Sequence, residues 1–508
     1  MRTLGTFALV VSAILVAPPA QAQDNAGARA ARVWRQAHER QILDEYVAFL
    51  KIPNVSRDLV NVRRNADYLL REMQRRELKP RLLEVPGAAP VVYGEILVPG
   101  ATHTYVFYSH YDGQPLDPKE WTTPPFEPTL RTDRLDRGGK VVPFPPVGQR
   151  IDPEWRLGAR SASDAKAAIF SILTAVEALK AAGVQPRANI KFVFEGEEEM
   201  ESPNFGRILA ANKELLKADL WFICDGPEDP GGRLTVVFGV RGIQKMEVTV
   251  YGPNRALHSG HYGNWAPNPG LMLSQLLASM KDADGRVLVE HFYDGVVPLT
   301  AAELAAIAES DSDAVQKKEL GLGRVDGSGK SLGELISLPS LNIRGISSGR
   351  VGDQAANIIP TTATAAIDMR LVKGVTKEGQ VSRVLDHIRK QGYFIVTSEP
   401  DDATRLAHPK VAKVVVGTDG YNAARTPMDL PLAQQVLATA RSVRSPIAVK
   451  PTSGGSTPLD TIQNVLGTQT ISIPIANYDN NQHSSNEDIK LQNLWNGFET
   501  HAALMTME

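Results

Sequence analysis

The sequence predicts an α/β protein in which a mainly parallel sheet, with helices on both faces, is interrupted by a smaller α+β sandwich. Three observations support this prediction. Helical and strand-like segments alternate from about Val33 to Phe238, as in a parallel sheet with helical crossovers. The pattern then changes to half-exposed strands with two helices, and the first pattern returns after about Gly417. A chain of 508 residues is also too long for one ordinary core, so at least two domains are expected.

The first 22 residues have the layout of a secretory signal peptide. A short basic start is followed by an apolar stretch from about Leu4 to Ala17 and by small residues that end at Ala22. The apolar stretch is shorter than the roughly 20 residues that a bilayer span needs, so we expect cleavage after Ala22 rather than an anchor. No later segment is long and apolar enough to span a membrane. The prediction is an exported bacterial protein, periplasmic or secreted.

Apolar periodicity gives the elements expected before Phe238. Apolar residues at helical spacing predict helices over 35–49, 62–77 and 165–182. Short apolar runs predict strands over 91–97, 104–109, 190–194 and 220–224. The Pro- and Gly-rich segment 114–153 has no periodicity and is expected to be a long surface loop.

The middle of the chain predicts a separate folding unit. Strands are expected over 244–251, 341–346, 363–372 and 393–397, and helices over 269–281 and 377–391. The charged segment 282–334 yields no clear element. A helix near 432–443, a strand near 468–475 and a last helix from Glu487 return to the first pattern. The expected division is a signal peptide (1–22), a discontinuous main domain (23–237 and 418–508) and an inserted domain (238–417).

Composition narrows the class of partner. The 55 basic and 57 acidic residues nearly balance, and no basic stripe is present, so nucleic acid is not an expected partner. Cys224 is the only cysteine, so the chain has no internal disulfide and its stability must come from packing, with metals as a possible addition.

Acidic and histidine side chains follow the ends of three predicted strands, at 109, 194 and 224. They are His110 and Asp112 after the first strand, the acidic run Glu195–Glu199 after the second, and Asp225 after the third. In open parallel sheets this edge is where ligands bind. Asp164 directly precedes a predicted helix, where the helix N-terminus favours a carboxylate, and His483 lies in a polar loop before the last helix. The sequence therefore predicts that these groups gather at one edge of the sheet.

Each of these residues alone has an ordinary explanation. A histidine after a strand can be a surface residue, an acidic run can be a solvated helix start, and an aspartate can cap a helix or form a turn. Their order along the chain and their common position at one sheet edge favour a shared site. Two imidazoles with several carboxylates suit Zn²⁺ or a similar divalent ion.

Ten short segments carry a resemblance to a known family. They are 109–113, 158–166, 195–199, 222–225, 239–242, 257–263, 357–360, 370–372, 454–456 and 483–487. In this order they resemble the dinuclear metallopeptidases that include carnosinase-type dipeptidases, carboxypeptidase G, aminoacylases and succinyl-diaminopimelate desuccinylase. The resemblance spans nearly the whole mature chain, and Leu-His-Ser-Gly-His-Tyr-Gly at 257–263 favours the dipeptidase branch.

The resemblance implies that five residues hold two metal ions. Asp164 would bridge the ions. His110 and Asp225 would complete one site. Glu199 and His483 would complete the other. Zinc is the expected metal, and Mn²⁺ or Co²⁺ would accept the same ligands.

The resemblance also implies the roles of residues that do not bind metal. Asp112 would orient His110. Glu198 would be the general base that takes a proton from metal-activated water and passes it to the leaving amine. His258 would stabilise the oxyanion across a homodimer interface, with the inserted domain acting as lid and dimerisation domain. The substrate carboxylate would contact Arg370, Asn357, Gly454, Gly455 and Ser456.

Three features depart from the family pattern. Ala165 and Ala167 stand where the family usually has aspartate and glycine, and Glu201 stands where it usually has glycine. An insertion near 131–156 lengthens the segment before Asp164. None of these changes removes an expected ligand, so they bear on the substrate more than on the reaction.

The preferred interpretation is an exported, dimeric, zinc-dependent dipeptidase or carboxypeptidase-like amidohydrolase that cleaves a small, carboxylate-bearing peptide. A deacylase of N-acyl-amino acids would use the same site and is the alternative within the enzyme class. A non-catalytic periplasmic binding protein is the alternative from another class. The presence of Glu198 together with all five expected ligands argues against that second alternative.

Overall fold

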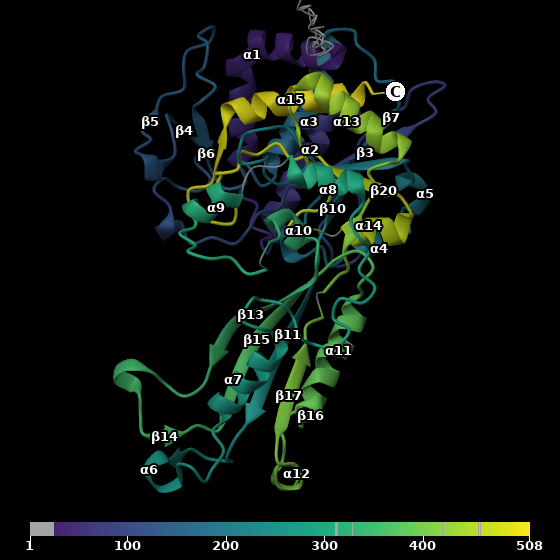
Figure 1. The fold of residues 1–508 in the computed structure, drawn as a ribbon. Helices are drawn as coiled ribbons and strands as arrows, with labels where there is room; N and C mark the ends of the chain where they lie inside the picture. Colours follow the sequence, from purple (N-terminus) through teal and green to yellow (C-terminus); the bar gives the residue numbers. More distant parts are fainter. Residues whose placement is uncertain are drawn as a thin grey trace, which may run out of the picture.

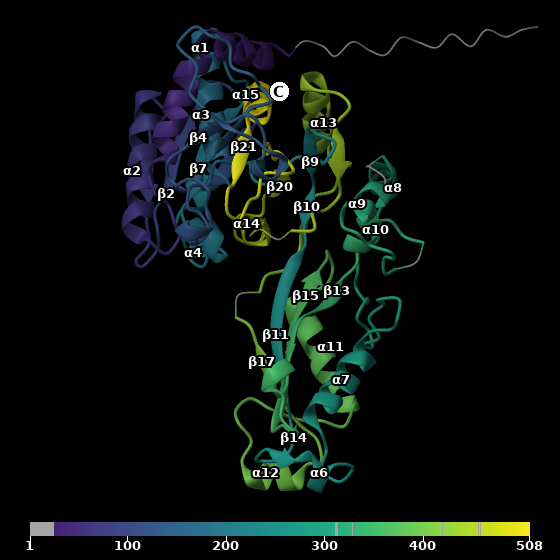
Figure 2. The ribbon, with the colours of Figure 1, turned by 90° about the vertical axis from the view of Figure 1, so that its left-hand side faces the viewer.

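The computed structural model describes residues 25–309, 313–327, 329–418, 420–455, 457 and 459–507. The signal peptide expected at 1–22 lies outside these residues. Figures 1 and 2 show a larger body of sheets and helices from which an elongated unit extends. No helix in the described ranges combines the length and apolarity that a bilayer crossing requires.

The larger body is built on an eight-stranded mixed sheet. Its four central strands are mutually parallel, and a strand that runs antiparallel to them flanks this group on each side. The order is β1 (Arg81–Leu83), β2 (Val91–Ile96), β7 (Asn189–Glu195), β3 (Thr104–His110), β8 (Leu220–Ile223), β20 (Gln469–Ser472), β9 (Thr235–Val237) and β19 (Ala448–Lys450). The prediction of a mainly parallel sheet is therefore confirmed for its central strands.

Helices cover both faces of this sheet because its central strands are apolar on both sides. Along β3, Tyr105 and Phe107 enter one hydrophobic core, and Val106 and Tyr108 enter the other. The first core is covered by α1 (Ala26–Leu50), α2 (Leu59–Arg75), α3 (Lys166–Ala181), α13 (Pro431–Val443) and α15 (Leu491–Met505). The second is covered by α4 (Phe205–Ala211) and α14 (Leu459–Leu466).

The elongated unit has its own five-stranded sheet and its own core. The strand order is β13 (Ser340–Ser347), β15 (Thr362–Leu371), β11 (Gly242–Tyr251), β17 (Val411–Val416) and β16 (Phe394–Val396). Helices α7 (Pro269–Met280) and α11 (Lys377–Lys390) pack on this sheet (Figure 1). The expected α+β unit is present, and it includes one strand, β17, that was not predicted from the sequence.

Two segments differ from the sequence expectation. The expected loop 114–153 contributes β4 (Thr129–Arg131) and β5 (Val141–Val142) to a small sheet with β6 (Arg156–Gly158) and β21 (Asp488–Lys490). Because β21 pairs with β6, the last helix begins at Leu491 and not at Glu487.

In the described part of the charged segment 282–334, three helices begin. They are α8 (Ala301–Ala308), α9 (Asp313–Glu319) and α10 (Leu332–Ile336). Thr300 and Ser331 form capping boxes at the starts of α8 and α10. A capping box is a sequence signal for a helix start, although neither helix was predicted. Helix α8 contacts β19 of the larger sheet, although it lies within the inserted stretch of sequence.

Candidate metal centre and substrate cavity

The parallel strands bring the predicted ligands to one edge of the large sheet. His110 is the last residue of β3 and is paired in register with Glu195 at the end of β7. The chain after β7 forms the short helix η3 (Glu198–Met200), and Asp225 follows β8 by two residues. Neighbouring parallel strands end together, so residues distant in sequence meet at this edge.

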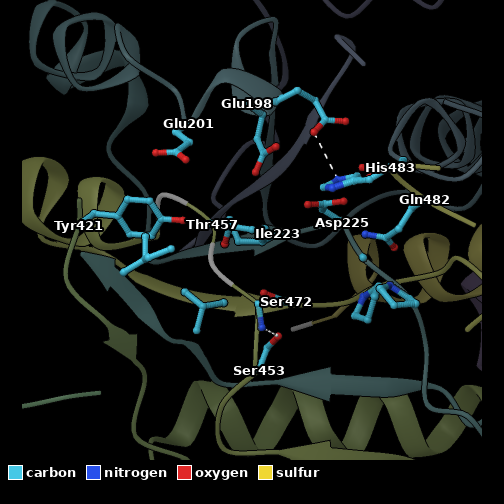
Figure 3. Close-up of a pocket in the computed structure, with 18 of the residues that line it drawn as sticks. Glu198, Glu201, Ile223, Asp225, Tyr421, Ser453, Thr457, Ser472, Gln482 and His483 are labelled. Carbon is cyan, nitrogen blue, oxygen red and sulfur yellow. Dashed lines mark hydrogen bonds and ion pairs between the residues drawn. The ribbon is translucent and has the colours of Figure 1, made fainter. Parts of the chain in front are cut away.

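Asp164 lies at the centre of this cluster, with one pair of predicted ligands on each side of its carboxylate. On one side, His110 Nε2 lies 3.2 Å from Asp164 Oδ1 and 3.7 Å from Asp225 Oδ1. On the other side, His483 Nε2 lies 2.9 Å from Asp164 Oδ2 and 3.4 Å from Glu199 Oε2. In Figure 3, Asp225 and His483 lie next to each other on the cavity wall. The two groups are arranged as two metal sites that share Asp164 would require.

The donor set fits divalent cations. His110 Nε2 and Asp164 Oδ2 are buried and make no hydrogen bond, so both atoms are available as metal ligands. Donor atoms of His110, Asp164 and Glu199 all lie within 4.8 Å of one another. Two imidazoles and three carboxylates match the nitrogen and oxygen ligands that Zn²⁺, Mn²⁺ and Co²⁺ accept.

The electrostatics of the cluster also favour bound cations. Burial, with further contributions from Asp225 and Asp164, raises the pKa of Glu198 well above its usual value, although His110 opposes the shift. Burial and the charge of Asp164 raise the pKa of Glu199 to about 10. Several carboxylates cannot all ionise in one buried space without positive charge, and divalent ions supply that charge.

Asp112 supports the cluster from behind. Its Oδ1 lies 3.3 Å from His110 Nδ1, so His110 Nε2 faces Asp164. Its two carboxylate oxygens also accept hydrogen bonds from the backbone amides of Glu198 (3.3 Å) and Glu199 (3.0 Å). One carboxylate therefore orients an imidazole and fixes the backbone of two acidic residues.

Two supporting residues were not identified from the sequence. Gln114 donates a hydrogen bond to Glu199 at 2.7 Å. Glu487 is completely buried and accepts hydrogen bonds from the backbone amides of Ser161, Ser163 and Asp164, with further bonds from Arg160 and Ser163 side chains. Its position four residues after His483 was the available signal. Glu487 joins the loop that carries His483 to the loop that carries Asp164.

A cavity of about 530 Å³ is lined by the other members of the cluster, which are Asp164, Glu198, Glu199, Asp225 and His483; His110 lies behind its wall. Arg370, on β15, and Gly455 line the same cavity. Gly454 instead lines a smaller neighbouring cavity beside α10, so the expected carboxylate-binding turn is divided between two cavities. Ser456 lies outside the described residues.

His258 and Asn357 do not lie near this cavity. They belong to the far end of the elongated unit, where β12 (Leu257–His258) pairs with β14 (Ile358–Ile359). Ser259 donates a backbone hydrogen bond to the Asn357 carbonyl at 2.9 Å, and the His258 ring lies tilted by 38° against the His261 ring, with 4.6 Å between centroids. Neither His258 nor Asn357 is among the described residues that line the cavity, and both are exposed. Within one chain Asn357 therefore does not line the cavity that Arg370 lines, and its contact with the substrate carboxylate stays a prediction.

Comparisons with known proteins give a consistent result. The family described as peptidase family M20/M25/M40 matches residues 106–507. The Cys-Gly metallodipeptidase DUG1 of Candida albicans is 26% identical over 422 residues, which cover 81% of this chain and 80% of that protein. The Beta-Ala-His dipeptidase of Homo sapiens is 26% identical over 428 residues, covering 81% and 75%.

A solved structure extends the similarity to the whole fold. It is that of the M20 family metallo-carboxypeptidase Sso-CP2 from Sulfolobus solfataricus, which superimposes with a TM-score of 0.73 at 27% identity. The match covers 92% of this chain and 98% of that one, so it includes both the larger body and the elongated unit.

Proposed function

This chain belongs to peptidase family M20/M25/M40, and from that premise we propose that it is a dipeptidase that uses two zinc ions. It is a metal-dependent hydrolase of peptide bonds. The observation that carries the narrower proposal is the position of Asp164, with His110 and Asp225 on one side of its carboxylate and His483 and Glu199 on the other. The names of the two curated relatives support a dipeptide as substrate.

The proposed ligands would hold one ion with His110 and Asp225 and the other with Glu199 and His483, with Asp164 shared. Bound divalent ions would supply Lewis-acid chemistry, which makes a water molecule more acidic and polarises the scissile carbonyl. Asp112 would keep the His110 ring in the orientation that ligation requires.

Glu198 is the proposed general base. It is partly buried, lies 3.9 Å from His110 Nε2 and lines the cavity beside the proposed ligands. Burial and neighbouring carboxylates raise its pKa, and bound divalent ions would oppose this shift and favour the ionised form that accepts a proton. Glu198 would take the proton of the attacking water and donate it to the departing amine.

The other end of the substrate would be bound by positive and backbone groups. Arg370 and Gly455 line the same cavity as the metal cluster, and a guanidinium is well suited to a carboxylate. Gly454 would contribute through its backbone if the turn that it shares with Gly455 closes on the substrate. This arrangement favours substrates with a free carboxylate at the end that Arg370 binds.

A homodimer is the proposed assembly. Strand β13 is the edge of its sheet, and Ile343 and Ile346 on it are 37% and 59% exposed. An unpaired edge strand with exposed apolar side chains is a surface that a second copy can cover. His258, at the far end of the same unit, would then reach the cavity of the partner subunit and stabilise the oxyanion there.

Export is also proposed, on the basis of residues 1–22 alone. Their basic start, apolar stretch and small-residue ending support a cleaved signal peptide and a periplasmic or secreted location.

Hydrolysis of a substrate panel tests the proposed function. We expect turnover of free dipeptides, loss of turnover on treatment with a chelator, and recovery on addition of Zn²⁺, with metal content measured on the same preparation. Faster turnover of N-acyl-amino acids than of dipeptides would identify a deacylase instead. Turnover that survives complete removal of metal would contradict the proposal.

A further inference from the structure

Glu201 places a charged side chain in the cavity at a backbone position that favours glycine. It directly follows η3 and has φ 65°, in the left-handed region where residues other than glycine are uncommon. Because this backbone conformation is unfavourable for glutamate, the Glu201 side chain is a candidate for a role in the cavity.

The backbone of Glu201 is fixed relative to the proposed general base. The backbone amide of Glu201 donates a hydrogen bond to the Glu198 carbonyl at 2.8 Å. Both residues line the same cavity, and Figure 3 shows them directed into it from the same side. A group bound by Glu201 would therefore lie beside the reacting end of the substrate.

Lys245 orients the Glu201 carboxylate by pairing with one of its two oxygens. Lys245, on β11, lies with Nζ 2.6 Å from Glu201 Oε1, and its side chain also lines the cavity. Within the described chain, Glu201 Oε2 accepts no hydrogen bond. An ionised carboxylate can accept several hydrogen bonds, so Oε2 is available to a further donor.

The charges of the cavity match a zwitterion. Arg344 and Arg370 enter it from β13 and β15 of the elongated unit, whereas Glu201 enters from the loop that carries Glu198. A free dipeptide has a carboxylate at one end and an ammonium group at the other. We infer that Glu201 is a specificity-determining residue that selects substrates bearing an ammonium group, which donates to Oε2. This inference rests on the proposed peptide hydrolysis.

Two substitutions of Glu201 test the inference. Glu201→Gln removes the charge and keeps the shape, and Glu201→Gly suits the left-handed backbone, so a folding defect would not explain a loss shared by both. For each, we expect kcat/KM for Ala-Ala to fall about 10-fold, because an ionic hydrogen bond is lost. The value for N-acetyl-Ala-Ala should not change. If the acetylated peptide is not cleaved, its inhibition constant serves for the comparison.

The control variant is Glu247→Gln. Glu247 is an exposed glutamate on β11 that does not line the cavity, so removal of the same charge there should leave both substrates unaffected. A second pair, Lys-Ala and N-acetyl-Lys-Ala, identifies the ammonium group: a loss on Ala-Ala indicates the α-ammonium, and a loss confined to both lysine peptides indicates the side chain.

The outcomes separate this inference from the proposed function. If the unmodified enzyme cleaves dipeptides and both Glu201 variants lose equal activity on free and acetylated Ala-Ala and Lys-Ala, or lose none, the inference is wrong. If the unmodified, metal-loaded enzyme cleaves no peptide, the proposed function fails first and the inference fails with it.

Discussion

The metal cluster and the far end of the elongated unit differ in how they are positioned. In the first, three parallel strands and two loops hold His110 and His483 on opposite sides of Asp164, and His110 is fully buried. In the second, His258 and Asn357 are exposed and lie away from the cavity. A single chain therefore brings the five proposed ligands together, whereas His258 would act on a cavity only in the proposed dimer.

Removal of Asp164 should have the largest effect. Because Asp164 faces both halves of the cluster, Asp164→Ala should abolish paired metal binding and lower kcat/KM by about 10³-fold or more, as the loss of several kcal/mol of metal catalysis implies. Elemental analysis and dipeptide turnover provide the measurements. Asp136→Ala, at an exposed aspartate that does not line the cavity, is the control. Two retained metals in Asp164→Ala would refute its bridging role.

His258→Ala tests the other region. We expect kcat to fall about 10²–10³-fold with both metals retained, because an oxyanion contact acts mainly in the transition state. His291→Ala changes an exposed histidine elsewhere in the inserted stretch and should have no effect. Dimers that pair a His258→Ala chain with a Glu198→Gln chain should regain activity, since one cavity then has both groups. No recovery in verified mixed dimers would mean that His258 acts otherwise.

Glu487→Gln tests how the two loops of the cluster are joined. The amide cannot accept all of the hydrogen bonds that the buried carboxylate receives from residues 160–164, so its NH₂ group would face donors. We expect metal affinity or activity to fall about 10–100-fold, the usual effect of losing a group that supports ligands. Competition with a chelator measures the affinity. Glu499→Gln, at the Arg32 pair on α15, is the matched control, and equal behaviour of the two variants would dismiss a positioning role.

Ile346→Lys should act first on assembly, and should lower turnover only at enzyme concentrations where the weakened dimer dissociates. If a second copy covers β13, a charge at this exposed residue should weaken dimerisation about 10–100-fold, as loss of one buried isoleucine implies. Sedimentation velocity over a concentration series measures this. Val147→Lys, at an exposed valine in the long insertion, should leave the assembly unchanged. A dimer equally stable in both variants would place the interface elsewhere.

The sequence could predict the cluster because strand ends and ligand order are local signals. His110, Asp225 and the residues after β7 each follow an apolar run, and parallel strands then bring these ends together. Asp164 and His483 were identified from the ordered motifs. No local signal could show that His258 and Asn357 lie at a distant end, because that depends on the length and direction of β11 and β15.

Other features depended on contacts between distant segments. Strand β21 exists because Asp488 pairs with Gly158, which periodicity near Glu487 could not show. Helices α8 and α10 had a usable signal in their capping boxes, at Thr300 and Ser331. The role of Glu487 in holding the Asp164 loop required the fold, because its partners are mostly backbone amides more than 300 residues away.

The most direct test of the account is metal content and dipeptide turnover measured together in Glu198→Gln. Glu198 lines the cavity beside the proposed ligands and is not counted among them, so the variant should bind two metal ions per chain and show almost no hydrolysis. Normal hydrolysis by a fully metal-loaded Glu198→Gln enzyme would contradict the proposed mechanism. Loss of one or both ions would instead show that Glu198 is itself a metal ligand.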